Sequence, residues 1–169
     1  MNKLGYGGFS PSTSGGDGFI HISWGGSEFS DGTPSKPYPL EAGISNVRNF
    51  KIDDTVKAVY RASVTMNNDY NAKYFKLSVQ PNKTVDVYVG DNTEDTYLYV
   101  FTGSLPTDIT LGNLIVFNDD NTGSDAYMTW NSWATFDTIG QTTTTNYIIE
   151  ATTWAALTLE SMTIRAVIT

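Results

Sequence analysis

Cysteine is absent from this 169-residue chain, and histidine occurs once. Without cysteine there is no disulfide framework, no thiol nucleophile and no cysteine-ligated zinc site. The single histidine, His21, would have to be the base of any Ser-His-Asp triad, yet it lies in a Gly-flanked segment and the chain has no Gly-x-Ser-x-Gly motif. We therefore expect a protein that is not an enzyme.

Long apolar runs are also missing. No run approaches the roughly 18–20 apolar residues that span a bilayer, and the first eight residues lack the apolar stretch of a signal peptide. The net charge of −8 argues against binding to a phosphate backbone, which needs clustered Lys and Arg. With 40% hydrophobic residues, the chain has the composition of one folded domain. We expect no membrane partner and no direct contact with nucleic acid.

Basic residues are missing from one long stretch, since none occurs between Lys83 and Arg165. Residues 91–169 hold ten acidic residues and a single basic one. These carboxylates could simply keep a β surface rich in Thr, Asn and Ser soluble. The alternative is an acidic face that docks a basic partner or binds a cation.

The N-terminal part is dominated by Gly, Ser and Pro over residues 1–18 and 25–46. Such segments hold neither a regular helix nor a long central strand. We expect residues 1–46 to form an extended arm and residues 47–169 to form the folded domain. Aromatic side chains spaced along the arm would fill pockets on neighbouring subunits: Tyr6, Phe9, Phe19, Trp24, Phe29 and Tyr38.

Apolar and polar residues alternate from Phe50 onward, as in half-buried strands. The pattern predicts strands over 56–66, 74–80, 84–89, 96–101, 111–117, 126–130, 147–151 and 157–168, the last with a bulge near Glu160. No stretch has capped helical periodicity. The prediction is an all-β fold, an antiparallel sandwich or jelly roll of eight or nine strands.

Two acidic loops resemble each other, because each places Asp-Asn-Thr after one predicted strand and before another. We interpret them as two equivalent hairpins, neighbours at one end of the fold. Their carboxylates are hard oxygen ligands suited to Ca²⁺, although the EF-hand pattern is absent and solvated turns are the simpler interpretation. The candidate calcium ligands are Asp91, Glu94, Asp95, Asp119, Asp120 and Asp125. No other cofactor is expected.

Aromatic residues cluster between Tyr127 and Phe136. Tyr127 and Trp133 could stack on a sugar ring if exposed, whereas buried Trp in a sandwich core is the commoner case. Trp133 is expected in a loop. A third possibility is a small glycoside hydrolase that uses Glu150 and Glu160 as its carboxylate pair.

A small, cysteine-free, all-β chain that is rich in Thr, Asn and Gly and begins with a Gly/Pro-rich arm resembles the accessory structural proteins of bacteriophage virions. These include capsid-decoration proteins, head fibres and tail or neck components. The resemblance implies a non-catalytic protein in the virion, made in the host cytoplasm, that assembles with other virion proteins as a homo-oligomer. A carbohydrate-binding or adhesin module is the alternative.

Overall fold

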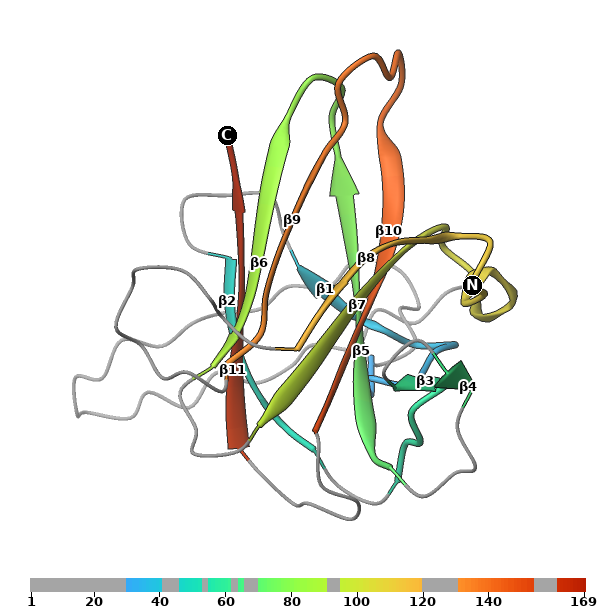
Figure 1. The fold of residues 1–169 in the computed structure, drawn as a ribbon, viewed down its shortest axis with the longest axis vertical. Helices are drawn as coiled ribbons and strands as arrows, with labels where there is room; N and C mark the ends of the chain where they lie inside the picture. Colours follow the sequence, from blue (N-terminus) through green and yellow to red (C-terminus); the bar gives the residue numbers. More distant parts are fainter. Residues whose placement is uncertain are drawn as a thin grey trace, which may run out of the picture.

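The computed structural model describes residues 30–40, 46–52, 55–61, 64–65, 70–90, 95–119, 131–153 and 161–169. Two β-sheets pack face to face and form a nine-stranded sandwich (Figure 1). The prediction of an all-β sandwich is therefore confirmed. The arm residues Tyr6, Phe9, Phe19, Trp24 and Phe29 lie outside the described residues. In the described part of the chain, no helix is both long and apolar enough to cross a membrane.

The larger sheet has five strands in the order β1-β5-β10-β7-β8. They are β1 (Tyr38–Leu40), β5 (Ala72–Val79), β10 (Thr145–Thr153), β7 (Thr96–Thr102) and β8 (Leu114–Asn118). The smaller sheet has the order β2-β11-β6-β9, with β2 (Asn46–Lys51), β11 (Ser161–Ile168), β6 (Thr84–Gly90) and β9 (Trp133–Asp137). Neighbouring strands are antiparallel except that β1 runs parallel to β5.

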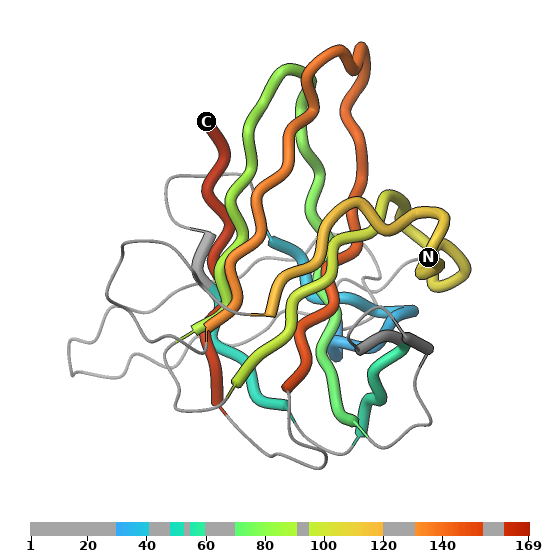
Figure 2. Tube along the Cα trace, in the orientation of Figure 1, coloured from blue at the N-terminus to red at the C-terminus, as the bar shows by residue number. Residues whose placement is uncertain are grey.

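Most connections cross from one sheet to the other. The chain passes from β5 to β6, from β6 to β7, from β8 to β9 and from β9 to β10 by changing sheets. The hairpin expected around the first acidic loop is therefore wrong, because that loop joins β6 and β7, which belong to different sheets. The second expected hairpin is not tested, because its strand over 126–130 lies outside the described residues. The β5–β6 and β9–β10 turns meet at one end of the sandwich, where the backbones of Lys83 and Thr138 are hydrogen-bonded (Figure 2).

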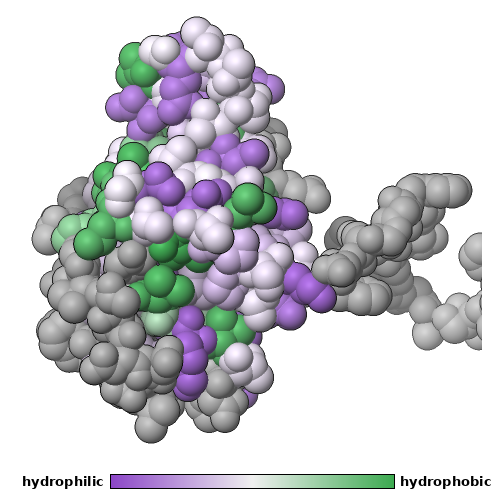
Figure 3. Space-filling model, turned by 90° about the vertical axis from the view of Figure 1, so that its right-hand side faces the viewer, coloured by the Kyte–Doolittle hydropathy of each residue, from purple (hydrophilic) through white to green (hydrophobic). Residues whose placement is uncertain are grey.

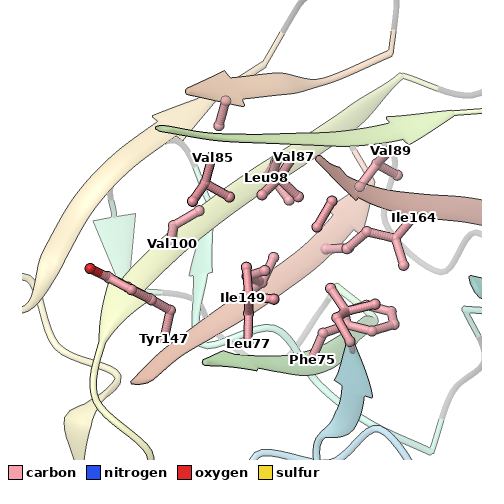
Figure 4. Close-up of a cluster of buried hydrophobic side chains, with 14 of the residues drawn as sticks. Phe75, Leu77, Val85, Val87, Val89, Leu98, Val100, Tyr147, Ile149 and Ile164 are labelled. Atoms are coloured by element: carbon pink, nitrogen blue, oxygen red, sulfur yellow. The ribbon is translucent and has the colours of Figure 1, made fainter. Parts of the chain in front are cut away.

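The main core fills the space between the sheets. Alternate residues of β5, β6, β7, β10 and β11 point into it, and Figure 4 shows Phe75, Leu77, Val87, Leu98 and Ile149 among them. These positions are the inward set of the period-two pattern, so the sequence predicted this layer correctly. Burying each such side chain contributes about 1.5–3 kcal/mol relative to leaving it exposed.

A second apolar cluster covers part of the outer face of the larger sheet. It contains Val56 and Ala58 from the segment before β5, Tyr97, Tyr99 and Phe101 from β7, and Ile148 from β10. Because both faces of β7 are covered, all its residues except Thr102 are buried. This explains why β7 is a nearly continuous apolar run instead of an alternating one.

The long strand expected over 56–66 is wrong. The chain there forms β3 (Tyr60–Arg61) and β4 (Val64–Thr65), a separate two-stranded sheet. The residues before β3 bond to the segment leading into β5: the N–H of Ala72 donates to the carbonyl of Val56, and that of Ala58 donates to Tyr70. The alternation correctly predicted that Val56 and Ala58 are buried. These residues belong to the second apolar cluster, however, and not to a strand of the sandwich.

Other predicted strands differ at their ends. β8 begins at Leu114, because Leu111–Asn113 form a turn, and β10 extends to both sides of the predicted 147–151. β9 was not predicted, and the strand expected over 126–130 lies outside the described residues.

Part of the segment expected as the arm, residues 1–46, belongs to the sandwich, because β1 pairs with β5. Tyr38 lies in β1, where its ring packs 5.7 Å from the ring of Phe75, and the Arg48 guanidinium carbon from β2 lies 4.0 Å above the Tyr38 ring. The expectation that Tyr38 contacts a neighbouring subunit is thus corrected, since its ring packs on Phe75 and Arg48 of its own domain. The segment from Ser30 onward is described as part of the domain.

Candidate functional site

The most exposed apolar surface of the described chain lies on β8 and the connection that precedes it. Ile115 and Phe117 point outward from β8 and are each 46% exposed, while Val116 between them packs on the main core. Leu105 and Leu111 in the β7–β8 connection are more exposed still. We call these four residues the β8 surface. Figure 3 views the molecule from the side on which the β7–β8 connection lies, and hydrophobic side chains are visible there among polar ones.

β8 also forms an edge of the larger sheet, so in the described chain its outer backbone edge is paired with no strand. Edge strands are usually protected by charge, proline or short length. The other edges have such protection: β1 has three residues and contains Pro39, β2 carries Arg48 and Lys51, and β9 ends on Asp137. β8, with the sequence Leu-Ile-Val-Phe-Asn, has neither charge nor proline, and its pairing with β7 shifts register between Val100 and Phe101.

The connection before β8 is held in place by Asp108. Its Oδ2 accepts hydrogen bonds from the backbone N–H groups of Ser104 and Leu105, at 2.8 and 2.9 Å. These two bonds hold the pKa of Asp108 below its usual value. Gly103, at φ +139°, gives the carboxylate room, because a Cβ there would overlap the Asp108 side chain. Leu105 and Leu111 are therefore presented by an ordered loop.

A second candidate site lies at the end of the sandwich where β7 and β9 begin and β8 ends. Ser132 connects the three strands: its N–H donates to Thr96 Oγ1 at 2.8 Å, and its hydroxyl donates to the backbone carbonyls of Thr96 and Asp119. The structure thus brings Asp95, next to Thr96, and Asp119 to the same end, as the sequence predicted. Asp91, Glu94, Asp120 and Asp125 lie outside the described residues.

Amide side chains that the sequence analysis did not select also lie at this end. Asn118 is the last residue of β8, and Asn131 precedes Ser132 and packs against Gly90 at the end of β6. Asn131 is only 7% exposed. Asparagines in loops are typical turn residues, so the sequence held no signal that separated these two from the others.

Trp133 is on strand β9, so its expected place in a loop is wrong. Its half-buried ring stacks on Tyr88 of β6, with centroids 5.7 Å apart and planes 4° apart, and its Nε1 donates to Asp86 Oδ1 at 3.2 Å. Asp86 also accepts a hydrogen bond from Thr135. The aromatic pair therefore stands on the outer face of the smaller sheet. Tyr127 lies outside the described residues.

Glu150 lies in the second apolar cluster with no exposed surface, under the segment that contains Val59. Its Oε2 accepts hydrogen bonds from the Tyr74 hydroxyl at 2.7 Å and from the Val59 N–H at 3.2 Å. A carboxylate buried in this way has no access to a substrate, which counts against its use as a glycosidase residue. Glu160 lies outside the described residues.

Comparison with known proteins gives a fold likeness only. No family model and no curated protein sequence matches the chain. Among solved structures, the periplasmic g-type lysozyme inhibitor PliG of Aeromonas hydrophila aligns with a TM-score of 0.49 and 12% identity, over 81% of this chain and 99% of that one. The pre-peptidase C-terminal domain of a Bacillus anthracis collagenase aligns with a TM-score of 0.47 and 9% identity, over 80% of this chain and 97% of that one.

Proposed function

We propose that this chain is a non-catalytic assembly protein that associates with a second copy of itself through the β8 surface. The observation that carries the proposal is an edge strand without charge or proline that exposes Ile115 and Phe117 side by side. Leu105 and Leu111, in the connection that precedes the strand, are exposed as well.

A second copy fits this edge because an antiparallel strand pair can be formed by two identical strands related by a twofold axis. Such pairing would satisfy the backbone groups at the edge of β8 and bury the outward side chains of both copies together. The absence of charge on β8 means that two copies meet there without repulsion. Asp119, directly after the strand, limits the uncharged stretch to β8 itself.

The proposed setting is a virion, as implied by the resemblance to accessory structural proteins of bacteriophages. An edge that joins identical subunits suits a protein built into a symmetric oligomer or lattice. Residues 1–29, which precede the described domain, would then contact other virion proteins through their aromatic residues.

The test is the mass of the full chain in solution by light scattering after gel filtration. We expect the wild type to be a dimer or larger, and Phe117→Lys to be monomeric, because a charge in the interface opposes pairing. Ile139→Lys is the matched control, since Ile139 is 71% exposed in the β9–β10 turn at another place on the surface. At about 50 μM protein, an interface with a micromolar dissociation constant is occupied. A wild type that is monomeric at this concentration would therefore refute the proposal.

Carbohydrate binding is a second candidate, favoured by the Trp133 and Tyr88 pair. The hydrogen bonds from Trp133 and Thr135 to Asp86 fix the indole on the outer face of an edge strand. A glycan array should then give a signal that Trp133→Ala abolishes and that Phe117→Lys leaves intact. An array with no signal for the wild type removes this candidate.

A further inference from the structure

Lys57 and Asn71 form an antiparallel bridge between the segment before β3 and the residues that lead into β5. The backbone hydrogen bonds on either side of the bridge join the residues that flank Lys57 to those that flank Asn71. The two residues are therefore a pair without mutual backbone hydrogen bonds, in which the Cα atoms are about 4.5 Å apart and the side chains are close. The Lys57 Nζ accordingly donates a hydrogen bond of 2.8 Å to Asn71 Oδ1.

The side-chain amide of Asn71 is fixed in a position that water does not reach. Asn71 has no exposed surface, and its backbone carbonyl accepts a hydrogen bond of 2.7 Å from the Thr152 hydroxyl. Its Oδ1 accepts the bond from Lys57, but in the described part of the chain its buried Nδ2 donates to no acceptor. A buried amide nitrogen without an acceptor costs free energy and requires an explanation. A reaction that releases this nitrogen removes that cost.

The Lys57 amine is placed to act as a nucleophile on this amide. Among the described residues it bonds to Asn71 and pairs with no carboxylate. The Asn71 Cγ is one carbonyl bond, about 1.23 Å, from Oδ1, so Nζ lies within about 4 Å of Cγ. Reacting atoms in a near-attack geometry are roughly 3–3.5 Å apart. Rotation about the flexible lysine stem covers the remaining difference.

We propose that Lys57 and Asn71 become joined by an isopeptide bond between their side chains. The half-buried Lys57 ammonium first gives one proton to water, and the neutral amine then attacks Asn71 Cγ. A second proton moves from Nζ to Nδ2, the Cγ–Nδ2 bond breaks, and ammonia leaves. The products are one Nζ–Cγ amide bond and one ammonia, so the step consumes no oxidant, reductant or co-reactant. Burial of Asn71 keeps water from competing for Cγ.

The cross-link fastens the segment around Lys57 to the larger sheet. Lys57 lies between Val56 and Ala58, which belong to the second apolar cluster. The closed loop spans 14 positions of the chain and contains β3 and β4. A covalent link of this kind stabilises mainly by restricting the unfolded chain. β10 and β7 separate β5 from β8 in the larger sheet, so this proposal and assembly through β8 can each fail alone.

The experiment is the intact mass of the full chain, unfolded in acid, by electrospray mass spectrometry. We expect a mass about 17 Da below the value calculated from the sequence, because one ammonia is lost. After digestion with trypsin, residues 52–61 should be found joined to residues 62–73, with no cleavage after Lys57. A wild type that has the full calculated mass would overturn the proposal.

Two lysine variants assign the loss of ammonia to this pair. Lys57→Arg keeps the charge and a hydrogen-bond donor, but the guanidinium stays protonated and does not attack an amide. It should have its full calculated mass and melt roughly 5 °C or more below the wild type. Lys76→Arg is the matched control, because Lys76 is exposed on β5 and the cross-link should still form. A loss of ammonia that persists in Lys57→Arg would indicate a succinimide at Asn71 and would refute the isopeptide bond.

Discussion

The Tyr74 hydroxyl donates a hydrogen bond of 2.7 Å to Glu150 Oε2, and neither side chain has any exposed surface. The two residues are directly opposite each other on the neighbouring strands β5 and β10. The Val59 N–H points at both oxygens, at 3.0 Å from the Tyr74 hydroxyl and 3.2 Å from Glu150 Oε2. The pair therefore holds the segment around Val59 on the outer face of the larger sheet.

Removing the Tyr74 hydroxyl should destabilise the protein. Tyr74→Phe deletes the donor to Glu150 and one acceptor of the Val59 N–H, and hydrogen bonds to a carboxyl group of this kind contribute about 1.5–3 kcal/mol. We expect a loss of this size in the free energy of unfolding, measured in urea. Tyr147→Phe is the control: it removes only a contact from Gln141 Nε2 and should cost about 1 kcal/mol or less. Equal losses in the two variants would contradict the role given to Glu150.

The same pair makes stability depend on alkaline pH. Burial, with the nearby charge of Glu150 and its hydrogen bond, raises the pKa of Tyr74 far above the usual value of about 10. Above pH 10 the unfolded chain releases the Tyr74 proton while the folded chain keeps it, so the unfolded state is favoured. Stability is thus retained below pH 10 and falls as the pH rises further, by up to about 1.4 kcal/mol per pH unit for this one proton.

The measurement that isolates Tyr74 is a comparison of wild type with Tyr74→Phe in urea between pH 9 and 11.5. The other tyrosines contribute equally to both proteins. The stability difference between them should be constant up to about pH 10 and should shrink above it. Parallel curves over the whole range would show that Tyr74 titrates in the folded protein as it does in the unfolded one.

Two glycines with positive φ should respond differently to alanine. A Cβ added at Gly140, where φ is +82°, would meet no atom within 4 Å, so Gly140→Ala bears only the backbone strain, about 1–2 kcal/mol. Gly103→Ala adds an overlap with Asp108 and should cost more, because it displaces the carboxylate that holds Ser104 and Leu105. Urea unfolding compares the two, and a smaller cost at Gly103 would contradict the role given to Asp108 in this loop.

Truncation should show which N-terminal residues the folded domain needs for its thermal stability. All the strands in the described part of the chain lie within residues 38–168, so removal of residues 1–29 should leave a cooperative thermal transition. Removal of residues 1–45 also deletes β1, with Tyr38 and its contacts to Phe75 and Arg48, and should lower the melting temperature. Circular dichroism melts compare the two truncations. Identical melts would mean that β1 does not contribute to the sandwich.

The sequence was informative wherever period two reflects one buried face. The strands around Phe75, Val87 and Ile164 follow it, and their inward residues form the main core. It failed where a second layer covers the sheet, because Val56 and Ala58 alternate like a strand but lie on the outer cluster. It also missed β9, although Ala134 and Phe136 alternate inward there, because the neighbouring Trp130 and Met128 offered a competing pattern.

The candidate sites were less predictable than the fold. A continuous apolar run such as Leu114–Phe117 predicts a strand but cannot show which side of it is left uncovered at a sheet edge. The burial of Asn131 and of Glu150 depends on chain crossings between sheets that no local pattern encodes. Of the acidic residues singled out from the sequence, Asp95 and Asp119 flank the backbone groups that Ser132 binds, whereas the other four lie outside the described residues.

The most direct test of assembly through β8 uses the natural absence of cysteine. Ile115→Cys and Ile139→Cys each give a chain with a single thiol, one in the β8 surface and one in the distant β9–β10 turn. After treatment with a short bis-maleimide at micromolar protein concentration, the account predicts a covalent dimer for Ile115→Cys and a monomer for Ile139→Cys on a denaturing gel. A monomer for Ile115→Cys, or equal dimer in both, would contradict it.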